Sequence, residues 1–215
     1  MSKMRTMNQL QTTLDREFSW RLKEIANLKV VVRSSENINR KTAVRAAIPL
    51  LYGHWEGFIK NASTNYLEYV NNQSLKYEDL KSCFVVLGVK KKINELIRSK
   101  NSDTSISTLE FLRDELNEKA KLKIESAIRT EFNLSSKVFA NIANSIGINT
   151  KTYEARYKLI DESLLSRRNH IAHGEYLDVD STGFRDLADE ILFLLRSYKT
   201  DIENAVSLEE YRVST

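Results

Sequence analysis

The sequence is poor in the residues on which turns and sheets depend. One proline and six glycines occur in 215 residues, while leucine, alanine, lysine, glutamate and arginine fill long uninterrupted stretches. This composition favours helices and leaves few sites for β-turns. We therefore predict an all-α fold, organised as a single domain over residues 1–215 with an insertion or irregular segment at about 101–134.

Cysteine is also scarce. Cys83 is the only one, so the chain cannot form an intrachain disulfide or a cysteine metal cluster. The first residues, MSKMRTMNQLQTTLDREF, carry scattered charges, and no stretch of the chain approaches the ~18 apolar residues that a membrane span requires. These features predict a cytoplasmic protein with no membrane partner.

Metal and nucleotide motifs are missing as well. The sequence has no Asp/Glu cluster or Cys/His pattern with the spacing of metal ligands. It has neither a GxxxxGK loop nor a GxGxxG turn. We therefore expect no metal and no cofactor.

The charges nearly balance: 33 Lys and Arg against 29 Asp and Glu give a net charge of +4, which by itself says little about nucleic acid. Residues 86–100 concentrate part of the excess, with Glu95 as their one acidic residue. A row of cations there is a candidate RNA-binding surface, but a solvated helix face explains the same charges more often. The basic residues of this stretch are Lys90, Lys91, Lys92, Arg98 and Lys100.

Apolar residues at spacings of three and four predict helices over most of the chain. The strongest pattern runs from 38 to 70, and Pro49 inside it is expected to bend that helix. Residues 101–105 are predicted to be a loop, and 121–133 could be a strand, an extended arm or irregular. The other expected helices are 6–32, 86–100 after a short turn at 77–82, 107–120, 135–146 with a stop at Gly147, 153–173 and 184–205.

One flank of the 38–70 helix carries polar residues. At ~100° per residue, Arg45, Tyr52 and Glu56 fall together there, whereas His54 falls on the other side of the apolar stripe. We assign Trp55 to the core because it lies on that stripe. Glu56 is a candidate for a supporting role at a site, although an ion pair with Lys60, four residues on, is the slightly favoured alternative.

The segment RRNHIAHGEY, residues 167–176, holds two of the three histidines of the chain. In a helix, Asn169 and His173 lie four residues apart on one face, with Arg168 about 100° away, so the three can meet. An imidazole beside a guanidinium suits proton transfer next to a phosphate. Spacing alone favours a simpler explanation, since polar residues commonly collect at a helix C-terminus and Gly174 is expected to end this helix.

The motif and its surroundings resemble a known family. Arg168 to His173 match the R-x-x-x-x-H signature of the HEPN superfamily of all-α domains, in the form RRNHIAHG that is similar to MAE-type, RiboL-PSP-like bacterial HEPN nucleases. AAIPLLYGHWEGFIKNASTNYLEYV resembles the long helix of that branch, and FNLSSKVFANIANSIGI with LIDESLLSRRNHIAHG resembles its C-terminal half. The resemblance covers about two thirds of the chain and implies a HEPN-type helical bundle with extra helices.

The resemblance also implies an activity. HEPN nucleases of this kind are endoribonucleases that need no metal: the ribose 2′-OH attacks the adjacent phosphate and leaves a 2′,3′-cyclic phosphate. By this resemblance His173 would transfer a proton, Arg168 would hold the phosphate, and Asn169 would orient one of them. Supporting residues would come from Glu56, Arg45, Tyr52 and His170.

Partners follow from the same resemblance. The substrate would be RNA, with tRNA as one candidate, and two chains would form a homodimer that brings two motifs together. Such enzymes act as toxins or anti-phage effectors beside an antitoxin or ATPase partner. Some are silenced by modification of a tyrosine two residues after the histidine, but Glu175 stands there and Tyr176 follows it. The alternative is a HEPN module that binds RNA, a nucleotide or a protein without cleavage.

Overall fold

The computed structural model describes residues 4–124, 128, 130, 133–176 and 179–213. These residues form helices and two isolated β-bridges, and no strand occurs among them. The all-α prediction is confirmed. Within the same residues, no helix is both long and apolar enough to cross a membrane.

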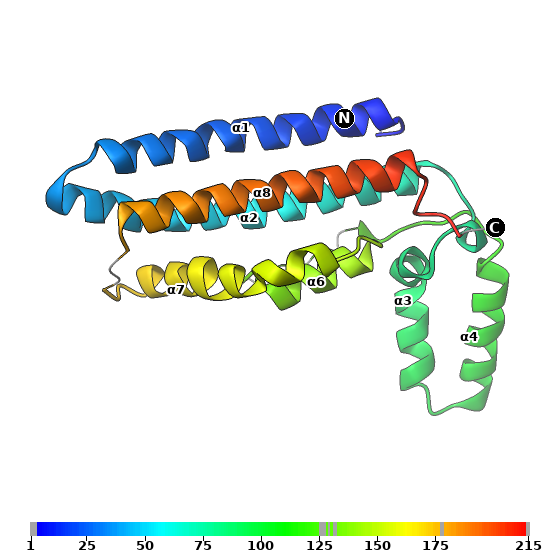
Figure 1. Ribbon diagram of the computed structural model, residues 1–215. Helices are drawn as coiled ribbons and strands as arrows, with labels where there is room; N and C mark the ends of the chain where they lie inside the picture. The colour runs from blue at the N-terminus through cyan, green and yellow to red at the C-terminus, as the bar shows by residue number, and fades with distance from the viewer. Residues whose placement is uncertain (1–3, 125–127, 129, 131–132, 177–178, 214–215) are drawn as a thin grey trace.

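Three long helices lie side by side and form the main bundle (Figure 1). They are α1 (Met7–Ser34), α2 (Asn37–Asn72) and α8 (Ser181–Ser207). Helices α2 and α8 run in the same direction and α1 runs against both. The sequence predicted all three to within a few residues, because each keeps an apolar stripe over many turns.

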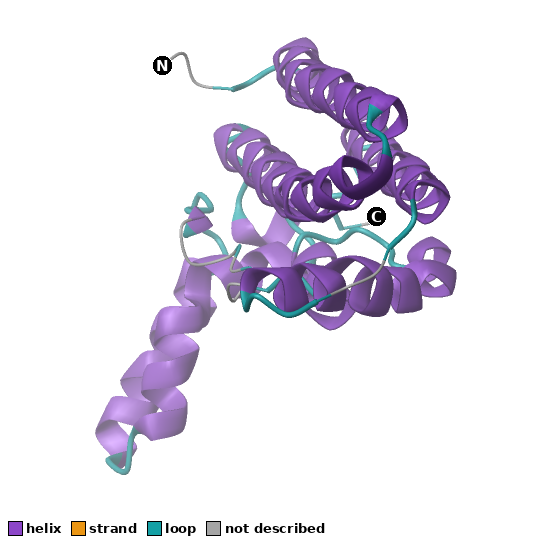
Figure 2. Ribbon diagram, turned by 90° about the vertical axis from the view of Figure 1, so that its left-hand side faces the viewer, coloured by secondary structure: helices purple, strands orange, loops and turns teal. Residues whose placement is uncertain are grey.

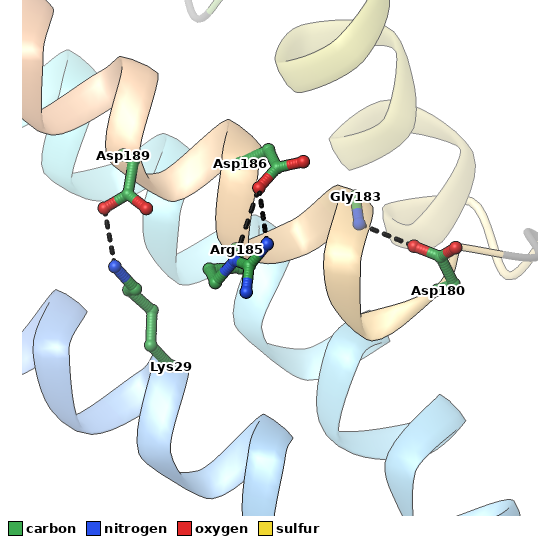
Figure 3. Close-up of polar contacts among 6 residues, drawn as sticks. All are labelled: Lys29, Asp180, Gly183, Arg185, Asp186 and Asp189. Carbon is green, nitrogen blue, oxygen red and sulfur yellow. Dashed lines mark hydrogen bonds and ion pairs between the residues drawn. The ribbon is translucent and has the colours of Figure 1, made fainter.

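Polar residues fix where two of these helices start. Thr6 and Gln9 form a reciprocal capping box at the start of α1. The Asp180 carboxylate accepts a hydrogen bond from the Gly183 N–H at the start of α8 (Figure 3). An ion pair of 2.5 Å between Lys29 and Asp189 joins α1 to α8.

A second row of helical segments packs under this bundle (Figures 1 and 2). It consists of α6 (Ser136–Ser145), a 3₁₀-helix (Lys151–Arg156), a π-helical segment (Leu159–Ser166) and α7 (Arg167–Ala172). The prediction of one helix over 153–173 is wrong in detail, since the hydrogen-bond register changes within it. Gly147 ends the α6 region at a φ of +76°, as predicted.

A hairpin of two helices projects from one end of the molecule (Figures 1 and 2). It consists of α3 (Ser82–Arg98), which follows a 3₁₀ turn (Tyr77–Asp79), and α4 (Ser102–Glu115). The loop predicted at 101–105 is wrong: Asn101 caps α4 by accepting from the Asp103 N–H at 2.8 Å.

The region after α4 contains no strand among its described residues. Lys119 forms one isolated bridge with Lys76, and residues 121–123 are irregular. The rest of the segment expected at 121–133 lies partly outside the described residues.

The core is centred on an aromatic group from four elements, here called the aromatic core: Trp55, Phe139, Tyr153 and Tyr198. The ring of Phe139 lies 5.2 Å from Trp55, 5.0 Å from Tyr153 and 5.6 Å from Tyr198. Each of the four side chains is at most 1% exposed. The assignment of Trp55 to the core is confirmed, and α2, α6 and α8 are held together where these rings meet.

Candidate functional site

Helix α7 ends in a turn whose backbone is fixed by hydrogen bonds. The His173 N–H donates to the Asn169 carbonyl, the Gly174 N–H to that of Ile171, and the Glu175 N–H to that of His170. This is a Schellman motif, and it requires Gly174 in the left-handed region, at a φ of +77°. The predicted stop at Gly174 is confirmed, and it places His173 at the C-cap, directly after the last residue of α7.

Helix α2 positions the segment that faces the motif. The Leu134 N–H donates to the Tyr52 hydroxyl at 2.7 Å, and the Leu134 carbonyl accepts from the Trp55 indole at 3.4 Å. Two side chains one turn apart thus bind both backbone groups of one residue. Asn133, the residue before it, is thereby held beside Arg168.

Arg168 is held by two neighbours among the described residues. Its Cζ lies 4.0 Å from the centre of the Tyr52 ring, and its Nη2 donates to the Asn133 Oδ1 at 2.9 Å. A guanidinium over an aromatic face is attracted by the ring and loses little of its planar geometry. Arg168 remains partly exposed, so its position is fixed while its charge stays within reach of a ligand.

Tyr52 stays protonated at neutral pH. Burial raises the pKa of Tyr52, while the hydrogen bond from Leu134 and the charge of Arg168 act in the opposite direction and Glu56 adds to the increase. A neutral phenol can accept from Leu134 and keep its ring under Arg168. The hydroxyl and the ring of Tyr52 thus contact Leu134 and Arg168 from the α2 flank.

Arg45 contacts the same turn from α2. Its Nη1 donates to the Glu175 carbonyl at 3.0 Å. Beside this contact is an open hollow of about 630 Å³, lined by Ile38, Lys41, Thr42, Arg45, Gly174 and Tyr176. The Tyr176 side chain is 76% exposed at its edge. The hollow adjoins the turn that carries His173.

His173 and Asn169 present side chains without internal partners. The His173 side chain is exposed and that of Asn169 is partly buried. Across the described part of the chain, neither side chain forms a hydrogen bond or ion pair, to Arg168 or to any other residue. Both polar groups are available to a ligand.

His170 has a different role. Its Nδ1 lies 2.7 Å from the Ser166 carbonyl, and its Nε2 lies 3.4 Å from the Glu175 carboxylate. These contacts link the start of α7 to the residue after its stop. His170 was included among the supporting residues, and it supports the turn rather than facing Arg168.

Glu56 and His54 are two further polar residues of α2. Glu56 is partly buried, and the expected ion pair with Lys60 does not occur among the described residues. His54 is 4% exposed and its Nε2 lies 3.2 Å from the Glu24 carboxylate on α1. His54 therefore belongs to the α1–α2 contact, on the opposite flank from Tyr52, as predicted.

The lysine row lies far from the motif in the chain as folded. Lys90, Lys91 and Lys92 are on α3, at the end of the molecule opposite α7 (Figures 1 and 2). Lys91 and Lys92 pair with Glu95 at 3.9 and 3.1 Å, and Lys92 also lies over Phe111. Within one chain these lysines therefore lie away from Arg168 and His173.

Sequence reasoning missed Asn133 and Glu175. Asn133 falls in a segment without clear periodicity. The one sequence signal near it is the predicted helix cap Ser135, two residues later. Glu175 directly follows the stop glycine, where a Schellman turn brings the backbone against the helix. No group of three or more His, Cys, Asp or Glu side chains arranged to hold a metal occurs among the described residues.

The comparisons with known proteins give one family. The model of the MAE_28990-like HEPN family matches residues 10–211. This range includes nearly all of the three long helices and the turn at 167–176 that carries the motif. No curated protein and no solved structure matches the chain.

Proposed function

Because the chain belongs to the MAE_28990-like HEPN family, we propose that it is an endoribonuclease that cleaves RNA without a metal ion. The ribose 2′-OH attacks the adjacent phosphate, and the cut ends carry a 2′,3′-cyclic phosphate and a 5′-hydroxyl. One observation carries the proposal: Tyr52 and Asn133 hold Arg168 in place on the helix that is followed by His173, whose side chain is exposed and has no partner among the described residues.

Arg168, His173 and Asn169 have different roles in this proposed reaction. Arg168 neutralises the phosphate, whose negative charge grows as the 2′ oxygen attacks. His173 accepts the 2′-OH proton or donates a proton to the departing 5′ oxygen. The Asn169 side chain makes no hydrogen bond to any described residue, so its amide orients the substrate or His173 when RNA is bound.

The complete site comprises two chains. Acid and base catalysis of one cleavage uses two proton-transferring groups, and each chain supplies one His173 on an open turn. A homodimer in which two α7 turns face each other across a cleft provides both histidines and two phosphate-binding arginines. Light scattering of the purified protein tests this point, and a strict monomer would contradict it.

The hollow beside the turn binds a neighbouring nucleotide in this proposal. Lys41 and Arg45 line it and attract phosphate. Tyr176 presents an exposed ring at its edge, and single-stranded RNA is commonly held by stacking of a base on such a ring. The RNA would therefore cross the turn from Arg168 toward Tyr176.

The test compares two histidines of one helix. Wild type, His173→Ala and His170→Ala are incubated with bulk RNA and with tRNA in EDTA, and fragment ends are identified by their response to kinase and phosphatase. We expect His173→Ala to lose about 10²–10⁴-fold in rate, the usual contribution of a general acid or base. His170→Ala should retain most of the activity, since its ring is already bonded to Ser166 and lies beside Glu175.

Two results would overturn the proposal: no cleavage by wild type, or equal cleavage by His173→Ala. The first would favour the second candidate, a HEPN module that binds RNA, a nucleotide or a partner protein without cutting it. We further propose a toxin or anti-phage setting, with an antitoxin or ATPase as partner. Growth arrest on expression of wild type, relieved by His173→Ala, is the expected result.

A further inference from the structure

The α3–α4 hairpin has little to hold it in place beyond its base. From Lys90 to Glu115, Thr108 is the only buried residue. The hairpin stands away from the bundle in both views (Figures 1 and 2). At ~1.5 Å per residue, α3 is about 25 Å long and α4 about 21 Å, which gives the hairpin a long exposed flank.

The surface of the hairpin is unusually apolar. Among the described residues, 15 large hydrophobic side chains are exposed, and six of them lie in this short hairpin. Such a concentration on a projecting element is typical of an interaction surface. The six are Val86, Ile97, Ile106, Leu109, Phe111 and Leu116.

The apolar residues of α4 form a row with acidic residues beside it. Ile106, Leu109 and Leu116 are spaced by three and seven, so they share one face of the helix. Asp103, Glu110 and Asp114 are spaced by seven and four, and they share the neighbouring face. Arg113 is the only cation of α4.

Helix α3 repeats this arrangement with the opposite sign. Val86, Lys90 and Ile97 share one exposed face, and Lys91 and Arg98 share the next. Glu95 is the only acidic residue of α3, and it pairs with lysines of its own helix. The two helices of one hairpin thus carry opposite charges.

These opposite charges do not neutralise each other within the hairpin. Over the fully described stretch 82–116, no ion pair joins α3 to α4, and the carboxylates of Asp103, Glu110, Asp114 and Glu115 have no ion-pair partner. The basic face of α3 and the acidic face of α4 are both exposed. A surface of this kind is complementary to itself.

We propose that the hairpins of two copies of this chain pair with each other, α3 of one against α4 of the other. A twofold axis makes each such contact occur twice, which satisfies both charged faces of the two paired hairpins. The apolar rows supply the buried centre and the charged rows set orientation and partner choice. This contact lies at the opposite end of the molecule from α7. It is therefore separate from the proposed homodimer in which two α7 turns face each other, and it is independent of RNA cleavage.

Charge reversal tests the pairing in the full-length protein. The α3 variant carries Lys91→Glu and Arg98→Glu, and the α4 variant carries Glu110→Lys and Asp114→Lys; all four positions are outside the core. Each variant alone has two helices of one sign, so we expect its mass by light scattering to fall to half of the wild-type mass or less. An equimolar mixture presents opposite signs across the contact and should regain the wild-type mass.

A chain with all four substitutions serves as the matched control. It carries the same changes as both variants together but is again complementary to itself, so it should also assemble like wild type. Equal masses for wild type and both single-helix variants would overturn the proposal, as would a loss of mass that mixing does not restore. Weaker RNA binding by the α3 variant at unchanged mass would assign this face to RNA and likewise overturn the pairing.

Discussion

The aromatic core and the motif turn, residues 167–176, are held in different ways. The four rings of the core are at most 1% exposed and contact one another across α2, α6, α8 and the 3₁₀-helix. No residue of the motif turn is buried. The turn is fixed by backbone hydrogen bonds, by Arg45 on the Glu175 carbonyl and by Arg168 on Tyr52 and Asn133.

This difference separates stability from chemistry in the molecule. Apolar burial stabilises the core in proportion to its area, so core changes should act on the free energy of unfolding. The motif turn buries little, so changes there should act on the geometry of Arg168 and His173. Helix α2 links the two, because Trp55 belongs to the core and Tyr52 to the motif contacts.

Removal of a core ring should have the largest effect on stability. Phe139→Ala leaves a cavity among three other rings, and we expect it to lower the free energy of unfolding by about 3–5 kcal/mol. Urea denaturation followed by circular dichroism measures this loss. Phe193→Ala is the matched control: its ring is 46% exposed and lies under Arg156, so the loss should be no more than ~1 kcal/mol. Equal losses would contradict the assignment of the core.

Tyr52 tests whether α2 couples the two regions. Tyr52→Phe keeps the ring under Arg168 but leaves the Leu134 N–H without its acceptor, at a cost of about 1–3 kcal/mol for an unpaired buried donor. Tyr52→Leu also removes the ring face. We therefore expect Tyr52→Leu to reduce RNA cleavage well below Tyr52→Phe, and to be the less stable of the two because it also loses buried ring surface. Equal cleavage rates, compared under conditions where both are folded, would show that the ring does not position Arg168.

Alanine substitutions at two glycines should have smaller effects on the free energy of unfolding, and the two effects should have opposite signs. Gly174 has a φ of +77° and open space at its Cβ position, so Gly174→Ala should destabilise by ~1–2 kcal/mol through backbone strain alone. Gly53 lies exposed inside α2, also with open space, and Gly53→Ala should stabilise by about 0.5–1 kcal/mol. Thermal denaturation of both variants checks the signs. A neutral Gly174→Ala would mean that the turn does not depend on its left-handed residue.

The long helices could be predicted because their apolar periodicity persists for many turns. The segments around the motif could not be predicted as well. A change from α to π hydrogen bonding within Leu159–Ser166 shifts the register by one residue and leaves the composition unchanged. Residues 101–105 contain Ser, Asp and Asn, which occur in loops and at helix starts alike, and Asn101 proved to be a cap.

The candidate site also contains residues that the sequence predicted and residues that it did not. The helical angle alone placed Arg45 and Tyr52 on one flank, and both contact the motif turn. Asn133 was missed because its contact with Arg168 depends on how Leu134 is bound by Tyr52 and Trp55. Long-range contacts of this kind depend on packing between elements and leave no periodic signal in the sequence.

His54, the buried histidine, allows the contrast between the bundle and the motif turn to be tested through the pH dependence of stability. Burial lowers the pKa of His54 below 6.5, while Glu24 acts in the opposite direction and Arg21 reinforces the decrease. The unfolded chain therefore binds this proton more readily than the folded chain, so His54 makes the protein less stable as the pH falls below about 6.5. We expect a lower unfolding midpoint at pH 5.5 than at pH 7.5, and a smaller difference in His54→Gln. Glu24→Gln should enlarge the difference, since it removes the charge that favours protonated His54. If wild type and His54→Gln show the same difference, the acid sensitivity arises outside the bundle. Buried His54 would then not contribute to the pH dependence of stability, and its contrast with exposed His173 would be lost.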